Sequence, residues 1–318
     1  MTEGREIERS LLERAGCDSV ALPRGGNGVR RLARLPQSTL AARRVLREQE
    51  IDAVIGTGGG ATVPVGLAAR LLGLPLCLLE QNAVVGRANR MLAPFAQRLY
   101  LGLPSHRASG KAVLTGTPLR GEFGCVERSR AREEFGLDPN TPVVVVTGGS
   151  QGAEVLNTFV PPALCALGEP LQVVHLSGEG KDSAVRSLYA PGSDDGVEAI
   201  VRPLSLEIPK LLAAADLVVC RGGGCTVAEL IATGRPALIV PYPHHRDRQQ
   251  LHNARLLERV DAAVVVEQSE MSVSVLAARL RELLSDPMAL AEMGQRARTV
   301  APQDAAATIV EDLEGVVG

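Results

Sequence analysis

Short apolar runs alternate with longer amphipathic segments along most of the chain. The runs with the clearest strand character are 53–55, 76–79, 143–147, 173–176, 217–220, 237–240 and 263–266. Helical periodicity separates them, most clearly at 65–72, 155–167, 227–233 and 249–259. This alternation is typical of parallel sheets covered by helices. Because the pattern repeats in two similar halves, we predict an α/β protein with two Rossmann-like domains.

The length of 318 residues also favours two domains. A charged stretch at 121–142 is interpreted as the interdomain connection, and 272–317 is predicted to be helical with a break at Ala301–Pro302. The predicted domains are therefore 1–125 and 126–300. Residues 301–318 are predicted to form a C-terminal helix that packs back on the N-terminal domain.

Composition excludes several classes of partner. A net charge of -2 and only seven aromatic residues argue against a nucleic-acid-binding protein. No apolar run reaches the roughly 18 residues of a membrane span, and the charged N-terminus does not resemble a signal peptide. The six cysteines lack metal-ligand spacing, so neither a metal site nor a disulfide framework is expected. The sequence predicts a soluble cytosolic protein.

Three predicted strands run into glycine-rich turns, at 56–60, 148–152 and 221–224. In open parallel sheets, ligands bind outside the carboxyl ends of the strands, so a cleft between the two domains is the predicted site. The turn GGSQGA lets the backbone approach a ligand, and the helix that follows offers free N–H groups to a phosphate. The alternative is a plain tight turn in which Ser150 only caps the helix.

Two further segments carry candidate polar side chains. Glu229 follows Thr226 by three residues, which fits a capping box, but its carboxylate could equally accept hydrogen bonds from sugar hydroxyls. The amides of Gln249 and Gln250 suit neutral hydroxyls because each amide offers a donor and an acceptor. His244 and His245 have no partner that the sequence identifies. The catalytic base therefore stays unassigned.

The first half contributes polar and basic residues of its own. Glu80, Gln81 and Asn82 follow a buried strand, and Arg120 ends the run TGTPLR. Seven arginines and no acidic residue lie between positions 24 and 47, interspersed with Val and Leu. Such a surface could rest on an anionic membrane, or it could be an ordinary solvated helix with extended arginines.

Several of these motifs occur together in one order: GTGGG, LEQNAVVGRANRMLAPFA, TGTPLR, VVVVTGGSQGAEVLN and DLVVCRGGGCTVAELIATGRPALIVPYPHHRDRQQLHNA. In this combination the chain resembles the MurG family, the peripheral-membrane N-acetylglucosaminyltransferases of peptidoglycan synthesis. The resemblance extends from about residue 4 to the C-terminus and is most specific over 143–254.

The resemblance implies a GT-B architecture of two Rossmann-like domains and an inverting transfer of N-acetylglucosamine. The donor would be UDP-GlcNAc and the acceptor the C4 hydroxyl of lipid I, with lipid II as the product. No metal or other cofactor is implied. The implied partners also include an anionic membrane surface, at the cytoplasmic face of the plasma membrane, and cell-wall synthesis proteins.

The family's site residues carry over to matching positions, with the donor bound mainly by the C-terminal domain. Glu229 would hold the ribose hydroxyls, Ser150 would face the diphosphate, and Gln249 and Gln250 would contact the sugar. The uracil, ribose and phosphate would be lined by Gly224, Cys225, Thr226, Val227 and Ala228. Asn82 and Arg120 would reach the donor from the N-terminal domain, while Gly58 and Gly59 would cradle the acceptor pyrophosphate.

The chain departs from the family pattern at a few positions. Gly60 stands where an aromatic residue is usual, Thr117 where Asn is usual, and Cys225 and Ser205 where larger apolar residues are usual. The family's N-terminal strand, GGTGGH loop and helix, with the strand that follows, are also absent, so the N-terminal sheet is expected to be incomplete.

Two explanations of this absence stay open: a start site downstream of the true one, or a truncated paralogue that binds UDP-sugar without efficient transfer. For the function itself, another GT-B lipid glycosyltransferase is a further alternative.

Overall fold

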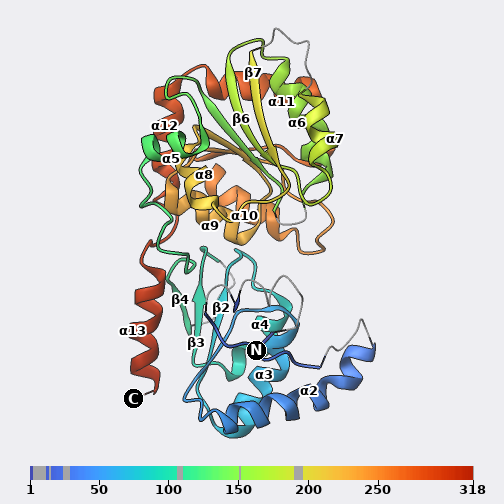
Figure 1. Ribbon diagram of the computed structural model, residues 1–318. Coiled ribbons are helices and arrows are strands. Elements are labelled where there is room, and N and C mark those ends of the chain that lie inside the picture. The colour runs from blue at the N-terminus through green and yellow to red at the C-terminus, as the bar shows by residue number, and fades with distance from the viewer. Residues whose placement is uncertain are drawn as a thin grey trace. The chain divides into compact units, whose positions relative to one another are not determined.

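The computed structural model describes residues 1–2, 12–13, 16–23, 29–105, 110–149, 152–189 and 196–317 (Figure 1). Contacts within the chain divide it into two units. The first unit comprises Met1–Gln81, Val85–Thr115 and Asp304–Gly318, and the second comprises Asn82–Val84 and Gly116–Gln303. The chain passes from the first unit to the second near residue 115 and returns to the first near residue 303. The predicted domain limits 1–125, 126–300 and 301–318 remain a prediction.

The first unit is built on a parallel sheet with the strand order β1-β2-β3-β4. Its strands are β1 (Val54–Gly56), β2 (Leu76–Glu80), β3 (Arg98–Leu101) and β4 (Ala112–Leu114). Its helices are α2 (Val29–Glu48), α3 (Gly59–Leu72), α4 (Arg87–Leu92), the short η1 (Ala93–Phe95) and α13 (Ala305–Val317).

Helices cover both faces of this sheet (Figure 1). On one face, Leu78 packs in a core with Ala42 of α2 and Ala68 of α3. On the other face, Tyr100 packs against Ile309 of α13, and its hydroxyl donates a 2.9 Å hydrogen bond to Asp312. Helix α13 is therefore an integral part of the first unit.

The segment 17–22 forms no strand of this sheet. Within the described residues, only Ala21 pairs there, in an isolated bridge with Thr2. The neighbouring Leu22 is nevertheless buried in the core beneath α2. The segment thus contributes packing rather than a strand.

The second unit contains a six-stranded parallel sheet with the order β10-β9-β8-β5-β6-β7. Its strands are β5 (Val143–Thr147), β6 (Leu171–Leu176), β7 (Val197–Arg202), β8 (Leu217–Cys220), β9 (Ala237–Ile239) and β10 (Ala263–Val265). Its helices are α5 (Arg128–Phe135), α6 (Glu154–Cys165), α7 (Asp182–Leu188), α8 (Ile208–Ala214), α9 (Gly224–Thr233), α10 (Gln249–Glu258), η2 (Gln268–Glu270), α11 (Val273–Leu284) and α12 (Pro287–Ala297).

This strand order is that of a doubly wound sheet. Successive strands are added in one direction from β5 to β7 and in the opposite direction from β8 to β10, so the strand order reverses between β5 and β8. Both strands are Val-rich and nearly completely buried, because helices lie on both faces of the sheet (Figure 1). Such a reversal leaves a crevice at the carboxyl ends of the two strands, where ligands of these folds bind. The predicted α/β class with a parallel sheet in each half is confirmed.

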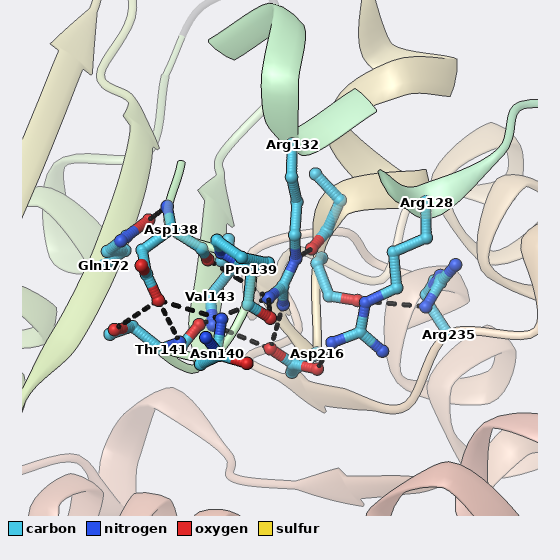
Figure 2. Close-up of polar contacts among 12 residues, drawn as sticks. Arg128, Arg132, Asp138, Pro139, Asn140, Thr141, Val143, Gln172, Asp216 and Arg235 are labelled. Atoms are coloured by element: carbon cyan, nitrogen blue, oxygen red, sulfur yellow. Dashed lines mark hydrogen bonds and ion pairs between the residues drawn. The ribbon is translucent and has the colours of Figure 1, made fainter. Parts of the chain in front are cut away.

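The stretch 121–142 is not the simple connection that its charge suggested. It contains α5, whose Arg132 is only 3% exposed. The Arg132 guanidinium donates to Asp216 at 2.6 Å and to the carbonyl of Pro139 at 2.7 Å, and Asp216 also accepts from the Val143 N–H at 2.8 Å (Figure 2). These bonds attach the charged stretch to the amino ends of β5 and β8.

Candidate functional site

Two glycine turns follow the central strands β5 and β8, and packing explains their glycines. A Cβ on Gly152 (φ +67°) would lie 2.0 Å from the carbonyl oxygen of Ser177. A Cβ on Gly222 would lie 2.3 Å from the carbonyl oxygen of Gln250. Both turns therefore need glycine for close backbone approach. Ser150, the predicted diphosphate contact, lies outside the described residues.

Helix α9 begins directly after the second of these turns. Its first intrahelical bond runs from the Val227 N–H to the carbonyl of Gly223 at 2.9 Å, so the N–H groups of Gly224, Cys225 and Thr226 precede the helical ladder. No acidic residue lies in the first turn, and no side chain caps the helix. The alternative of a capping box at Thr226 and Glu229 does not hold, because Gly223 is the N-cap and the helix starts earlier. A helix start of this kind suits a phosphate.

The predicted nucleotide-lining residues of α9 divide by exposure. Val227 and Ala228 are buried in the core, so only their backbone can face a ligand. Cys225 is exposed and Thr226 is half-buried. The exposed Cys225 lies one helical turn before Glu229, on the same face.

The carboxyl group of Glu229 is half-buried and largely shielded from water. Burial raises its pKa to about 7, and the positive charge of Arg120 opposes this rise. The Arg120 guanidinium donates to the carbonyl of Leu206 at 3.0 Å and lies 3.7 Å from the carboxylate of Glu122. The structure therefore brings Glu229 and Arg120, both predicted site residues, into electrostatic contact within the second unit.

The two glutamines at the start of α10 are held by neighbours in the loop after β9. The Gln249 Nε2 atom lies 2.7 Å from Nδ1 of His245, and the Gln250 Oε1 atom accepts a 3.0 Å hydrogen bond from the Tyr242 N–H. The His245 ring also meets the Tyr242 ring edge-on, with centroids 5.1 Å apart. His245 therefore has partners that the sequence did not reveal. These contacts orient the two amides before any ligand binds.

Arg221, which the sequence analysis did not single out, supports the same loop. It follows β8 directly and donates to the carbonyl of Val240 at 3.0 Å and to Oε1 of Gln268 at 3.1 Å. Its guanidinium carbon lies 5.6 Å from the centre of the Tyr242 ring. Its position directly before the GGG turn at 222–224 was the feature of the sequence that could have identified Arg221 as part of the site.

Asn253 is a second residue that the sequence did not assign to the site. It is fully buried, and its Nδ2 donates at 3.0 Å both to Oδ1 of Asn82 and to the carbonyl of Gly222. Its Oδ1 accepts from the Ala83 N–H at 2.8 Å. These bonds hold Asn82 beside the glycine turn after β8, and contacts group both Asn82 and Arg120 with the second unit.

Glu80, by contrast, has an internal role. It is 3% exposed, and its Oε2 accepts from the Gly86 N–H at 2.8 Å and from Nδ2 of Asn89 at 2.9 Å. Gln81 donates to the carbonyl of Thr57 at 3.3 Å. Glu80 therefore shapes the chain between β2 and α4 rather than facing a ligand.

The turn at Gly58 and Gly59 starts α3 in the first unit. Both residues have positive φ, +85° and +75°, and Gly58 is the N-cap of the helix. The Thr62 hydroxyl donates to the carbonyl of Gly58. The first turn of α3 contains no acidic residue, so this helix start is also compatible with an anion.

Part of the arginine-rich surface is described on α2. Arg44 and Arg47 are exposed, and Leu40 beside them is 60% exposed. Arg44 pairs with Glu48 at 2.6 Å. Arg24 lies outside the described residues, as do the side chains of Arg30 and Arg31. In the part of the chain that the structure describes, no helix has the length and apolar character needed to cross a bilayer.

Comparison with known proteins gives consistent matches for both halves. Residues 1–101 match the family model of the glycosyltransferase family 28 N-terminal domain, and residues 143–309 match that of the glycosyltransferase family 28 C-terminal domain. A relative from Hahella chejuensis is 39% identical and one from Aeromonas hydrophila is 41% identical. Each alignment covers 90% of this chain, and 80% and 79% of the relatives respectively.

Both relatives are named UDP-N-acetylglucosamine--N-acetylmuramyl-(pentapeptide) pyrophosphoryl-undecaprenol N-acetylglucosamine transferase. Among solved structures, MurG of Acinetobacter baumannii superimposes with a TM-score of 0.80 at 31% identity, over 97% of this chain and 88% of that one. A UDP-GlcNAc 2-epimerase from Neisseria meningitidis, at 13% identity and a TM-score of 0.68, shares the fold alone. The resemblance drawn from the motifs is thereby confirmed, and the chain belongs to glycosyltransferase family 28, among the MurG proteins.

Proposed function

We propose that this protein is an inverting N-acetylglucosaminyltransferase. It moves GlcNAc from UDP-GlcNAc to the C4 hydroxyl of the MurNAc residue in undecaprenyl-pyrophosphoryl-MurNAc-pentapeptide, lipid I, and so forms lipid II of peptidoglycan synthesis. Relatives named for this activity are identical to it at 39% and 41% of the aligned residues. The observation that carries the proposal is the grouping of an open helix start, a half-buried carboxylate with a raised pKa and oriented amides beside β8.

Each group in that site has a matching part of the donor. The N–H groups at the start of α9 face the diphosphate, and Glu229 accepts hydrogen bonds from the ribose hydroxyls. Gln249 and Gln250 bind the hydroxyls of the sugar, and Asn82 and Arg120 complete the donor site. In this arrangement Gln250 donates through its Nε2, since its Oε1 is engaged by Tyr242.

The reaction follows from this placement. The acceptor O4 attacks the anomeric carbon from the side opposite the diphosphate, the bond from that carbon to the phosphate oxygen breaks, and UDP leaves. The O4 proton passes to a base that we do not assign. The dipole of α9 and its free N–H groups stabilise the negative charge that develops on the leaving diphosphate.

The acceptor side rests on the first unit. Gly58 and Gly59 cradle the pyrophosphate of lipid I at the start of α3. The exposed arginines and Leu40 of α2 rest on the anionic membrane surface in which the acceptor is anchored. The enzyme is then peripheral and acts at the cytoplasmic face, where a nucleotide sugar is supplied.

The deciding experiment measures transfer of radiolabelled GlcNAc from UDP-GlcNAc to lipid I. We expect turnover by the wild type and a loss of at least about tenfold for Glu229→Ala, because the ribose loses its acceptor. Glu282→Gln, which alters an exposed carboxylate on α11, is the control and should keep full activity. Binding of UDP-GlcNAc without turnover would instead indicate a binding paralogue, and preference for UDP-glucose another lipid glycosyltransferase.

Membrane contact can be tested separately by flotation with vesicles. Vesicles of phosphatidylglycerol should bind the protein, and phosphatidylcholine vesicles should bind it weakly. Replacing both Arg44 and Arg47 by Gln should weaken binding about thirtyfold, since each basic residue near an anionic surface contributes about 1 kcal/mol. Equal binding to both vesicle types would contradict the proposed surface.

A further inference from the structure

The start of α10 lies against the glycine turn that follows β8. A Cβ on Gly222 would lie 2.3 Å from the carbonyl oxygen of Gln250 and 3.3 Å from its Cβ. Asn253, on the same helix, donates from Nδ2 to the carbonyl of Gly222 at 3.0 Å. Gln249 and Gln250 are themselves half-buried. The two glutamines therefore lie on a helix end that is packed beside the turn leading into α9.

The two glutamine amides are held at opposite ends. The Nε2 atom of Gln249 lies 2.7 Å from Nδ1 of His245, whereas the Oε1 atom of Gln250 accepts a 3.0 Å hydrogen bond from the Tyr242 N–H. Among the residues that the structure describes, the Oε1 atom of Gln249 and the Nε2 atom of Gln250 have no hydrogen-bond partner. Gln249 thus keeps its carbonyl oxygen for a ligand, and Gln250 keeps its NH₂ group.

The position of the proton on His245 follows from this arrangement. An amide nitrogen can only donate, so Nδ1 of His245 must accept and the ring proton must be on Nε2. If Nδ1 carried the proton instead, the Gln249 amide would have to turn its oxygen to His245 and its NH₂ group away. The proton position on one imidazole therefore decides which end of Gln249 is left for a ligand.

Tyr242 connects the two amides. Its backbone N–H binds Gln250, and its ring meets the half-buried His245 ring edge-on, with centroids 5.1 Å apart. The carbonyl of His245 also accepts from the Arg248 N–H at 2.9 Å, in the turn just before α10. His245 is therefore fixed through both its backbone and its ring, and its Nδ1 reaches Gln249 four positions later.

We propose that His245 is a positioning residue that sets the polarity of the sugar site. By accepting from Gln249 Nε2, it leaves the Gln249 carbonyl oxygen for a hydroxyl that donates, beside the Gln250 NH₂ group for a hydroxyl that accepts. The ligand is a hexose that offers one hydroxyl of each kind, and His245 itself does not contact it. This inference rests on the proposed function, in which both glutamines bind the sugar of the donor.

The first test exchanges each amide for a carboxylate, which can only accept. Calorimetry measures the ratio of UDP-GlcNAc affinity to UDP affinity, because only UDP-GlcNAc contains the sugar. Gln250→Glu loses its NH₂ group, and the ratio should fall at least about tenfold. Gln249→Glu keeps an acceptor for the sugar while His245 donates to it from Nδ1, so the ratio should fall only about threefold. A loss for Gln249→Glu as large as that for Gln250→Glu would overturn the proposal.

The second test changes His245 itself. His245→Phe keeps a ring against Tyr242 but removes the acceptor, and the affinity ratio should fall about fivefold. His245→Asn restores an acceptor oxygen near the position of Nδ1 and should return the ratio to within about twofold of the wild type. The matched control is His244→Phe, since the exposed His244 also meets the Tyr242 ring edge-on, at 5.3 Å. Equal losses in the two Phe variants, or no rescue by Asn, would refute the positioning role.

A measurement on the wild type does not depend on a variant folding. The ¹⁵N shifts of His245, assigned by their absence in His245→Asn, should show a protonated Nε2 and an unprotonated Nδ1. A doubly protonated ring or the opposite tautomer would overturn the proposal. Wild-type protein that binds neither UDP nor UDP-GlcNAc would refute the proposed function, whereas normal binding with an unchanged ratio in His245→Phe would refute only this inference.

Discussion

The glycine turns after β1 and β5 look alike in the sequence but are constrained differently in the structure. Each follows a strand, contains glycines with positive φ and leads into a helix. A Cβ on Gly59 would meet nothing within 4 Å, whereas one on Gly152 would lie 2.0 Å from a backbone oxygen. At Gly58 and Gly59 the first turn therefore needs glycine only for its backbone conformation. The second needs it also for close packing against buried, hydrogen-bonded backbone.

The largest effect should follow substitution in the packed turn. Gly152→Ala adds a clash with a backbone atom to an unfavourable positive φ and should lower the free energy of unfolding by about 4 kcal/mol. Its control is Gly168→Ala, with a φ of +69° and no atom within 4 Å of the added Cβ. The control should lose about 1 kcal/mol. Equal losses in urea denaturation would contradict the packing argument.

The next largest effect concerns the buried ion pair at the opposite end of the second sheet. Asp216→Asn leaves the nearly buried Arg132 without its counter-charge and should cost about 2 kcal/mol of stability (Figure 2). The exposed pair of Arg44 and Glu48 in the first unit is the comparison. Glu48→Gln should cost at most about 0.5 kcal/mol in the same denaturation assay. If Asp216→Asn costs less stability than Glu48→Gln, the Arg132 network does not stabilise the fold.

The pH dependence of the donor site should follow Glu229. Its pKa of about 7 is raised chiefly by burial, so the carboxylate that accepts ribose hydroxyls forms as pH rises through 7. UDP affinity should therefore increase about fivefold between pH 6 and pH 8. The folded state favours the protonated acid, so its contribution to stability is present below the unfolded pKa and is lost as pH rises through 7.

Glu229→Gln separates the contribution of Glu229 to these two pH dependences from the contributions of other titrating groups. Its neutral amide does not titrate, so both the rise in UDP affinity and the fall in stability attributed to Glu229 should disappear. Calorimetry and thermal melting at pH 6, 7 and 8 measure them. An unchanged pH profile in the variant would assign the titration to another group.

The smallest effect should come from the open turn in the first unit. Gly59→Ala should reduce the free energy of unfolding by about 1 kcal/mol, because alanine is disfavoured at a positive φ but its Cβ creates no clash. Under the proposed function it should raise the KM for lipid I more than the KM for UDP-GlcNAc. A loss of stability as large as that of Gly152→Ala would remove the distinction between the two turns.

Strand prediction succeeded for the two central strands of the second sheet, whereas the mostly buried β3 was missed. The runs 143–147 and 217–220 coincide with β5 and β8, because a central parallel strand is apolar at every position. Strand β7 was missed since VEAIVR includes two charged residues, Glu198 and Arg202, and forms an edge of the sheet. Strand β4 was missed because it has only three residues, and two of them are exposed.

The sequence supplied candidate residues for the site, which stay predictions, but it did not supply their environment. The motif around Glu229 drew attention to the carboxylate, but it did not show that Gly223 is the N-cap of α9 and that no capping box forms. The roles of Asn253 and Arg221 needed the structure, since their partners lie far along the chain. Asn253 bonds to Asn82, which is 171 positions away.

The sequence by itself determined the parallel α/β class, the positions of the glycine turns and the polar residues that follow the strands. These features depend on local periodicity and on backbone conformations that glycine adopts most readily. Only the tertiary structure decided which turn glycines are closely packed and which are open, and that burial raises the pKa of Glu229 to about 7. Those properties arise from desolvation and from hydrogen bonds between residues that are distant in the chain, and no local pattern specifies them.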